Sequence, residues 1–189
     1  IIDHVEANDY SDTPPIVIYH QILLSYKEPN DKKHFNSIKS LIEQHIHIFP
    51  ETEVKEILDS ALNYCIKKMN AGETEFVREA FSLYQDWLKR DLLQVRGNID
   101  PFHFKNIVTA GLRLNEFDWV ENFIHTYSLK MDESHRFNAL TFNLAQLYFY
   151  KKEYEKVIQK LNLVEYDDMT YNLNSKTLLM ASYYELDEI

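Results

Sequence analysis

Eight histidines are the side chains of this 189-residue chain that could bind a metal ion. A zinc-hydrolase motif places two histidines four residues apart, with a glutamate between them, and no such pair occurs here. His45 and His47 are two residues apart, so they lie on different sides of a helix. Others are isolated in the sequence: His20, His34, His103, His125 and His135. The pattern predicts structural histidines, no metal site and no cofactor.

Nucleophiles and phosphate-binding loops are equally scarce. The single cysteine, Cys65, cannot form an internal disulfide and falls on an apolar helical stripe, which favours a buried, inert thiol. Three isolated glycines cannot make a phosphate-binding loop. Carboxylate pairs such as Glu51/Glu53 and Asp167/Asp168 are common in an acidic chain and favour solvation over catalysis. We therefore predict that the protein is not an enzyme.

The charge balance narrows the class of partner. Twenty Lys and Arg against thirty Asp and Glu give a net charge of −10, which repels nucleic-acid phosphates and anionic membranes. The longest apolar run, Ile16–Leu24, is interrupted by His20 and Gln21, so no membrane insertion is expected. Residues 1–14 are acidic and predict a loosely ordered lead-in. We expect a cytoplasmic protein and, because the chain begins without Met, a fragment of a longer one.

The elements that must position any site are helical. Three glycines and five prolines leave few tight turns, which excludes an all-β sandwich or barrel. Apolar residues recur every three or four positions almost throughout, as they do from Val54 to Met69. For Ile16–Ile18 a short strand is the competing assignment, because all three residues are β-branched. Nine helices are expected, at about 15–26, 31–49, 51–69, 74–93, 101–114, 117–127, 134–148, 153–164 and 170–183. The fold class is all-α, with a softer joint at Leu93–Asp100.

An internal repeat is visible in the C-terminal half. An offset of 37 residues sets Ile107-Val108 on Leu144-Ala145 and Val120 on Val157. The same offset sets residues 115–118 (Asn-Glu-Phe-Asp) on 152–155 (Lys-Glu-Tyr-Glu). Each unit is therefore a helix, a turn and a second helix. One such pair cannot bury its apolar face alone, so the pairs must stack.

This repeat resembles the tetratricopeptide repeat (TPR) family, most closely over Thr141–Leu161. Leu144, Ala145 and Tyr148 match the family's L-G-x-x-Y pattern, and Tyr154 matches the aromatic that begins the second helix. Within this stretch the chain departs from the family at Val157 and Leu161. The Phe104–Ile124 unit is a weaker match, with Val108 in the small position and Gly111 where Tyr is expected, and neither unit ends with the expected proline.

The resemblance implies a right-handed α-α superhelix of antiparallel helix pairs. We expect one helical-repeat domain over residues 15–189, with irregular pairs at 15–93 and TPR-like repeats at 101–189.

The resemblance also implies a peptide-binding groove lined by the first helix of each pair. The groove residues beside the motif positions are Lys105, Asn106, Thr109, Arg113, Phe142, Asn143, Gln146, Phe149 and Tyr150. Asn106 and Asn143 occupy the same repeat position, where a side-chain amide could bond a peptide backbone. The alternative is that both are surface residues of an exposed helix. Tyr148 belongs to the core, so Phe149 or Tyr150 should be exposed, with packing against the next repeat as the alternative.

The last expected helix carries Leu178, Leu179 and Tyr183, which need a partner. The chain is therefore expected to continue, or its end to dock on another molecule, including a second copy of itself. We predict a scaffold that binds an unknown protein or peptide. The alternatives are a docking or regulatory segment of a larger enzyme or transcription regulator and, disfavoured by charge, a single-stranded RNA-binding repeat.

Overall fold

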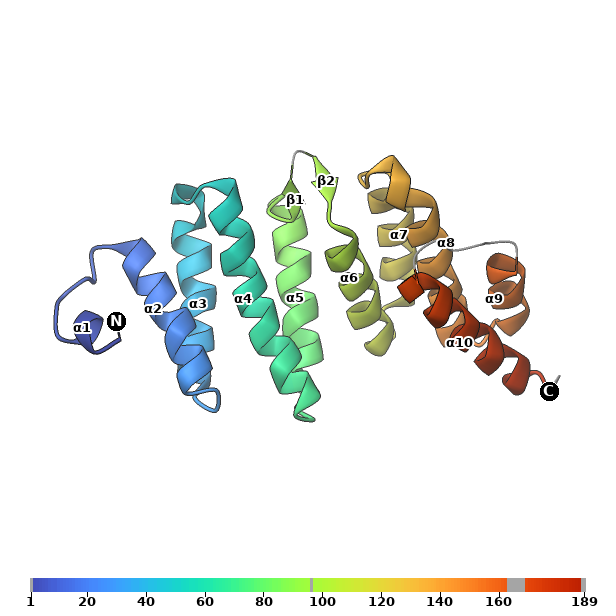
Figure 1. The fold of residues 1–189 in the computed structure, drawn as a ribbon, viewed down its shortest axis with the longest axis horizontal. Coiled ribbons are helices and arrows are strands. Elements are labelled where there is room, and N and C mark those ends of the chain that lie inside the picture. Colours follow the sequence, from blue (N-terminus) through green and yellow to red (C-terminus); the bar gives the residue numbers. More distant parts are fainter. Residues whose placement is uncertain (1, 96, 163–168, 188–189) are drawn as a thin grey trace. The chain divides into compact units, whose positions relative to one another are not determined.

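The computed structural model describes residues 2–95, 97–162 and 169–187, and it is built almost entirely of α-helices (Figure 1). Within this part of the chain there are ten α-helices, nine of them with seven or more residues: α1 (Ile2–Glu6), α2 (Pro14–Lys27), α3 (Lys32–His45), α4 (Glu51–Asn70), α5 (Glu75–Lys89), α6 (Pro101–Arg113), α7 (Phe117–Ser128), α8 (Glu133–Tyr150), α9 (Tyr154–Leu161) and α10 (Met169–Glu185). The predicted all-α class with about nine helices is confirmed. Ile16–Ile18 are helical, so the competing strand assignment was wrong.

Three short features, a 3-10 turn, a hairpin and a short helix, were not predicted. A 3-10 turn, η1 (Ile46–Ile48), follows α3. The strands β1 (Gln94–Val95) and β2 (Asn98–Ile99) form an antiparallel hairpin in the predicted softer joint. The third is α1, which lies within the acidic segment predicted to be loosely ordered. The strands β1 and β2 have two residues each, which is too few to show the alternation of apolar side chains by which a strand is recognised in sequence.

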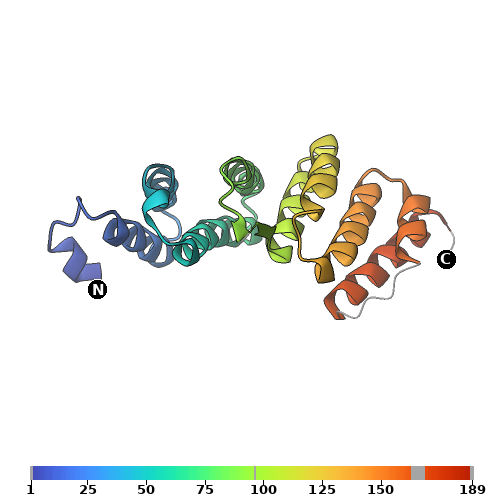
Figure 2. The ribbon, with the colours of Figure 1, turned by 90° about the horizontal axis from the view of Figure 1, so that it is seen from above.

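The helices form two compact units, Ile1–Leu92 and Leu93–Ile189. The predicted single helical-repeat domain over residues 15–189 stays a prediction. In the first unit α2 packs on α3 and α4, and α4 packs on α5. Figure 2 shows α2 and α4 in one layer of this unit and α3 and α5 in the other. Short loops join helices that are in contact, so the members of each pair run antiparallel.

An aromatic cluster ties the two pairs of the first unit together. The rings of Phe35 on α3 and Tyr64 on α4 stack with their centroids 4.8 Å apart. Phe76 on α5 meets both rings edge-on, at 5.9 and 5.7 Å. All three side chains are buried. Offset and edge-on pairs of this kind add to the stabilisation that burial alone provides.

In the second unit α8 is the central helix. It packs on α6, α7, α9 and α10, and α6 also packs on α7. Ala145 of α8 forms a buried cluster with Val157 and Leu161 of α9. Leu178 and Leu179 of α10 pack against this cluster, so these two residues find their partner within the chain. This corrects the expectation that they need one from outside it.

Aspartate caps set the starts of three helices. Asp31 accepts a hydrogen bond from the backbone N–H of Lys33, as the sequence predicts for α3. Asp100 does the same for Phe102 at the start of α6, where Pro101 is the first helical residue. At α8 the cap is Asp132, which accepts from Ser134 N–H. The helix expected from about residue 134 therefore begins one residue earlier, at Glu133.

The 37-residue repeat is present in the backbone of the turns. Asn115 and Lys152 occupy equivalent positions and adopt left-handed conformations, with φ of 60° and 61°. The next residue in each turn donates its N–H to an equivalent carbonyl, Glu116 to Gly111 and Glu153 to Tyr148. This is the hydrogen bond of a Schellman C-cap. The two helix pairs therefore close by the same local structure, although their sequences differ.

No helix of the described residues is both long and apolar enough to cross a membrane. The predicted carboxylate pair Asp167/Asp168 and the helix position Val164 lie outside the described residues.

Candidate functional site

The predicted groove residues lie on α6 and α8, two helices that pack on one another. Arg113 is exposed, and Tyr150 has 43% of its surface exposed. The partly buried members of the set are Lys105, Asn106, Thr109, Gln146 and Phe149. Among these, Thr109 donates its hydroxyl hydrogen to the carbonyl of Lys105, one turn back on the same helix.

Phe142 and Asn143 are the exceptions, because both are buried. Asn143 has no exposed surface and donates its amide hydrogen to the carbonyl of Ala139, at 2.7 Å. The prediction that these two residues line an open groove is corrected on this point. Because α8 contacts four other helices, it has more than one buried face, which a single apolar stripe does not indicate.

The three aromatic residues at the end of α8, Tyr148, Phe149 and Tyr150, differ in exposure because successive residues of a helix point in different directions. Phe149 packs against the α8–α9 cluster and meets the ring of Tyr154 edge-on, with the centroids 5.5 Å apart. Tyr148 packs against the same cluster. Tyr150 is therefore the member of the run that is free to meet another molecule.

Three side-chain amides on α6 and α8 have a buried atom without a hydrogen-bond partner among the described residues. These atoms are Nδ2 of Asn106, Oδ1 of Asn143 and Oε1 of Gln146. A buried polar atom left without a partner costs about 1–3 kcal/mol, so such atoms are rare unless water or a ligand supplies the bond. One donor and two acceptors on α6 and α8 are thus without a partner among the described residues.

A second feature of this unit is the outer face of α10. Leu173, Met180 and Tyr184 are exposed large apolar residues on this helix. Their spacing of seven and four residues places them on one side. The predicted self-association through this helix stays a prediction, and these are the residues it would use.

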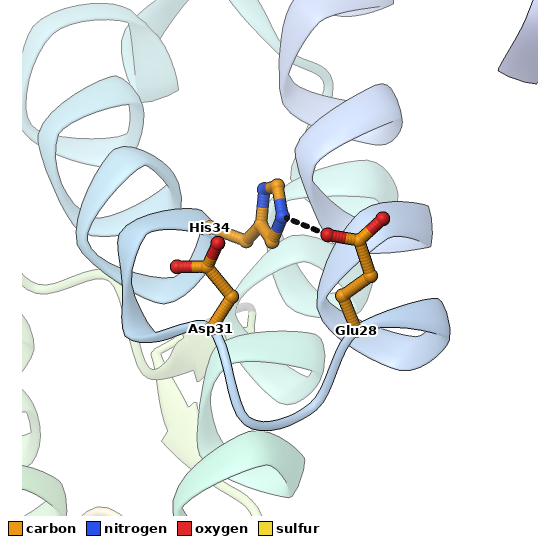
Figure 3. A group of neighbouring side chains, drawn as sticks. All are labelled: Glu28, Asp31 and His34. Carbon is orange, nitrogen blue, oxygen red and sulfur yellow. Dashed lines mark hydrogen bonds and ion pairs between the residues drawn. The ribbon is translucent and has the colours of Figure 1, made fainter.

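A group of possible metal ligands lies in the first unit, at the turn between α2 and α3. One candidate ligand atom from each of Glu28, Asp31 and His34 lies within 4.8 Å of the other two. Figure 3 shows the imidazole of His34 between the two carboxylate groups. Its Nε2 is 3.4 Å from Oε2 of Glu28, and its Nδ1 is 3.0 Å from Oε1 of Gln21.

The surroundings of these three side chains differ. His34 is buried, whereas the side chains of Glu28 and Asp31 are 46% and 36% exposed. The hydrogen bonds that Lys33 donates lower the pKa of Asp31 below its ordinary value, so this carboxylate is charged at neutral pH. Its second oxygen is 2.7 Å from Nζ of Lys33.

Sequence reasoning missed this group because the three residues do not share one helical face. They span a turn through Pro29 and Asn30, in the pattern Glu-x-x-Asp-x-x-His. The signal that could have found it is the helix cap. Asp31 begins α3, so His34 is fixed on its first turn and Glu28 follows the end of α2.

Cys65 and Glu53, which the sequence predicts to be unreactive, have structural roles. Cys65 is fully buried, and this burial raises the pKa of its thiol to about 12, which keeps it protonated and unreactive. Glu53 accepts a hydrogen bond from the hydroxyl of Tyr19 at 3.2 Å and so links α4 to α2.

An apolar cavity of about 390 Å³ lies beside α1 and α2. Val5, Tyr10, Ile16 and Leu23 contribute to its wall. Aliphatic and aromatic groups dominate this lining, so the cavity offers few polar contacts that would select a particular ligand.

Comparison of the chain with models of protein families, with curated proteins and with solved structures finds no match.

Proposed function

We propose that the protein is a non-catalytic, TPR-like scaffold that binds an extended peptide of a partner protein on the α6–α8 face. The proposal is supported by two partly buried amide side chains of this face, Asn106 and Gln146, each of which has one polar atom without a hydrogen-bond partner among the described residues. Peptide backbone groups are their chemical complements, because a carbonyl accepts from Nδ2 of Asn106 and an N–H donates to Oε1 of Gln146.

The two exposed members of the predicted groove supply other contacts of the kind that interfaces use. Arg113 and Tyr150 belong to residue types that are enriched at protein interfaces. The guanidinium of Arg113 can pair with a carboxylate through two parallel hydrogen bonds. An acidic side chain or C-terminal carboxylate in the peptide is therefore the expected partner of Arg113.

The helix pairs give the proposal its structural setting. Equivalent Schellman turns close α6–α7 and α8–α9, and the equivalent core residues Val120 and Val157 are both fully buried. Repeated pairs of this kind present a rigid helix face without further ordering on binding. The superhelical arrangement and the family relationship are part of the proposal.

The test is a selection from a random peptide library displayed on phage, with the full chain as bait. Selected peptides would be synthesised and their affinities measured by isothermal titration calorimetry. Replacing Asn106 or Gln146 by Ala should weaken binding about tenfold, since each loses one hydrogen bond worth about 1.4 kcal/mol in affinity. Asn143 is a poor target, because its replacement would also remove the bond to Ala139.

The matched control is Gln159→Ala, which removes an exposed glutamine from α9. Its affinity for the selected peptides should equal that of the unchanged chain. Selected peptides that bind all of these variants equally well would show that the α6–α8 face is not the binding site.

A further inference from the structure

We propose that Glu28, Asp31 and His34 form a binding site for a divalent transition-metal ion of the zinc type. The site lies in the first unit and is independent of the peptide-binding face proposed for the second.

The imidazole of His34 is buried and is held in a fixed orientation. His34 lies between two oxygen atoms, Oε1 of Gln21 and Oε2 of Glu28. With Oε1 of Gln21 as the acceptor, Nδ1 of His34 is the donor of this hydrogen bond. Metal binding requires a ring deprotonated at Nε2, whose lone pair would then face the carboxylate of Glu28. Metal-binding histidines have this arrangement, with the second ring nitrogen bonded to an oxygen that fixes the ring.

The distance between Nε2 of His34 and Oε2 of Glu28 is long for a hydrogen bond between charged groups. A hydrogen bond from a charged imidazole to a carboxylate would be about 2.7–2.9 Å long. The observed separation of Nε2 and Oε2 is 3.4 Å. Two ligand atoms bound tetrahedrally to zinc, each at about 2.0–2.1 Å from the ion, are about 3.3–3.4 Å apart. The separation of 3.4 Å is therefore compatible with two ligands of one ion.

The charge of the ligands and their exposure to solvent both suit a divalent ion. As metal ligands, two carboxylates and an imidazole bound through its lone pair would carry a charge of −2, which a divalent ion neutralises. Lys33, which is paired with Asp31, has a side chain that is 68% exposed, so it can turn into solvent and release a carboxylate oxygen. Glu28 and Asp31 are themselves partly exposed, which gives the ion a path from solvent.

The ligand types indicate which ion is bound. Imidazole nitrogen favours zinc, copper, iron and nickel, whereas magnesium and calcium prefer oxygen ligands alone. Three protein ligands leave a fourth tetrahedral position for water or for a group from another molecule. The ion would also join the end of α2 to the start of α3.

The experiment is a calorimetric titration of the full chain with Zn²⁺, after removal of bound metal with a chelator. The d–d absorption of Co²⁺, added in place of zinc, reports the coordination geometry. We expect one saturable site per chain, with Mg²⁺ unable to compete at equal concentration. Glu28→Gln and His34→Gln should each weaken zinc binding at least tenfold, and Gln21→Ala should weaken it about 10–100-fold.

Two controls keep the result interpretable. Glu28→Gln changes a half-exposed side chain, so its thermal unfolding should match that of the unchanged chain without metal, even if replacing the buried His34 disturbs folding. His47→Ala removes an exposed histidine of the same unit and should leave zinc affinity unchanged. The absence of a saturable site, or equal zinc affinity in Glu28→Gln and the unchanged chain, would overturn the proposal.

Discussion

Lys152 adopts a left-handed backbone conformation, with φ of 61°, at the turn between α8 and α9. A side chain with a Cβ atom costs about 1–2 kcal/mol in this conformation, whereas glycine adopts it freely. We expect Lys152→Gly to raise the free energy of unfolding by about 1 kcal/mol, as measured by urea denaturation. Lys160→Gly, an exposed site within α9, is the control and should lower it by about 1 kcal/mol. A loss of stability in Lys152→Gly would contradict this interpretation of the turn.

The burial of a residue was predictable from the sequence where a helix has a single apolar face. The core positions Ile107, Val108 and Ala145 follow the three-and-four spacing and are all fully buried. The burial of Asn143 was not predictable, because a polar side chain next to the motif leucine is exposed only if no other helix covers it. Four helices pack on α8, and the sequence does not indicate which of its remaining faces they cover.

At the scale of elements, the turn between α4 and α5 depends on a buried charge. The side chain of Lys68 is only 7% exposed, and its Nζ lies 2.8 Å from Oε1 of Glu73. Replacing Glu73 by Gln leaves this ammonium group buried without a counter-charge, which should cost about 2 kcal/mol of unfolding free energy. Glu75→Gln is the matched control, because its partner Lys32 is half exposed and the loss should be below about 1 kcal/mol. Equal losses in the two variants would show that burial of Lys68 does not matter.

A second ion pair joins α7 to α8 and should make stability depend on pH. The ammonium group of Lys151 donates a hydrogen bond to Glu121, which lowers the pKa of Glu121 and raises that of Lys151. A lowered carboxyl pKa stabilises the fold above the ordinary value of 4.5, and this contribution is lost as the pH falls through the folded value. A raised lysine pKa stabilises it below the ordinary value of 10.5, and this contribution is lost as the pH rises through the folded value.

The pair should therefore stabilise the protein most between these limits. We expect Glu121→Gln to lower the free energy of unfolding at pH 7 by up to about 1 kcal/mol, since the glutamate is partly exposed. In urea denaturation, the difference from the unchanged chain should shrink steadily below pH 4.5. Glu155→Gln, an exposed site on α9, is the control and should show little difference at either pH. A deficit in Glu121→Gln that grows in acid would reverse the sign of this argument.

Helix boundaries were largely predictable, because capping residues and glycines start and end helices through contacts within a few residues of sequence. Asp31 and Asp100 precede the first residues of α3 and α6, and α4 ends at Asn70, just before Ala71 and Gly72. The metal-ligand group was not predictable from spacing, since it combines the end of one helix with the start of the next. Whether Nε2 of His34 faces a carboxylate depends on ring orientation, which Gln21 fixes from thirteen residues away.

At the scale of the whole molecule, the division into two units predicts that damage to one core leaves the other folded. Leu144 is 4% exposed at the centre of the second unit, where an aspartate would bury a charge without a partner. We expect Leu144→Asp to unfold the second unit, with a large loss of helical circular dichroism. Cys65, buried in the first unit, should stay resistant to a thiol reagent until urea is added. The matched control is Leu129→Asp, because Leu129 is 70% exposed and its replacement should change neither measurement. Rapid labelling of Cys65 in Leu144→Asp would show instead that the two units fold as one cooperative structure, and in that case the cores would have to be treated together.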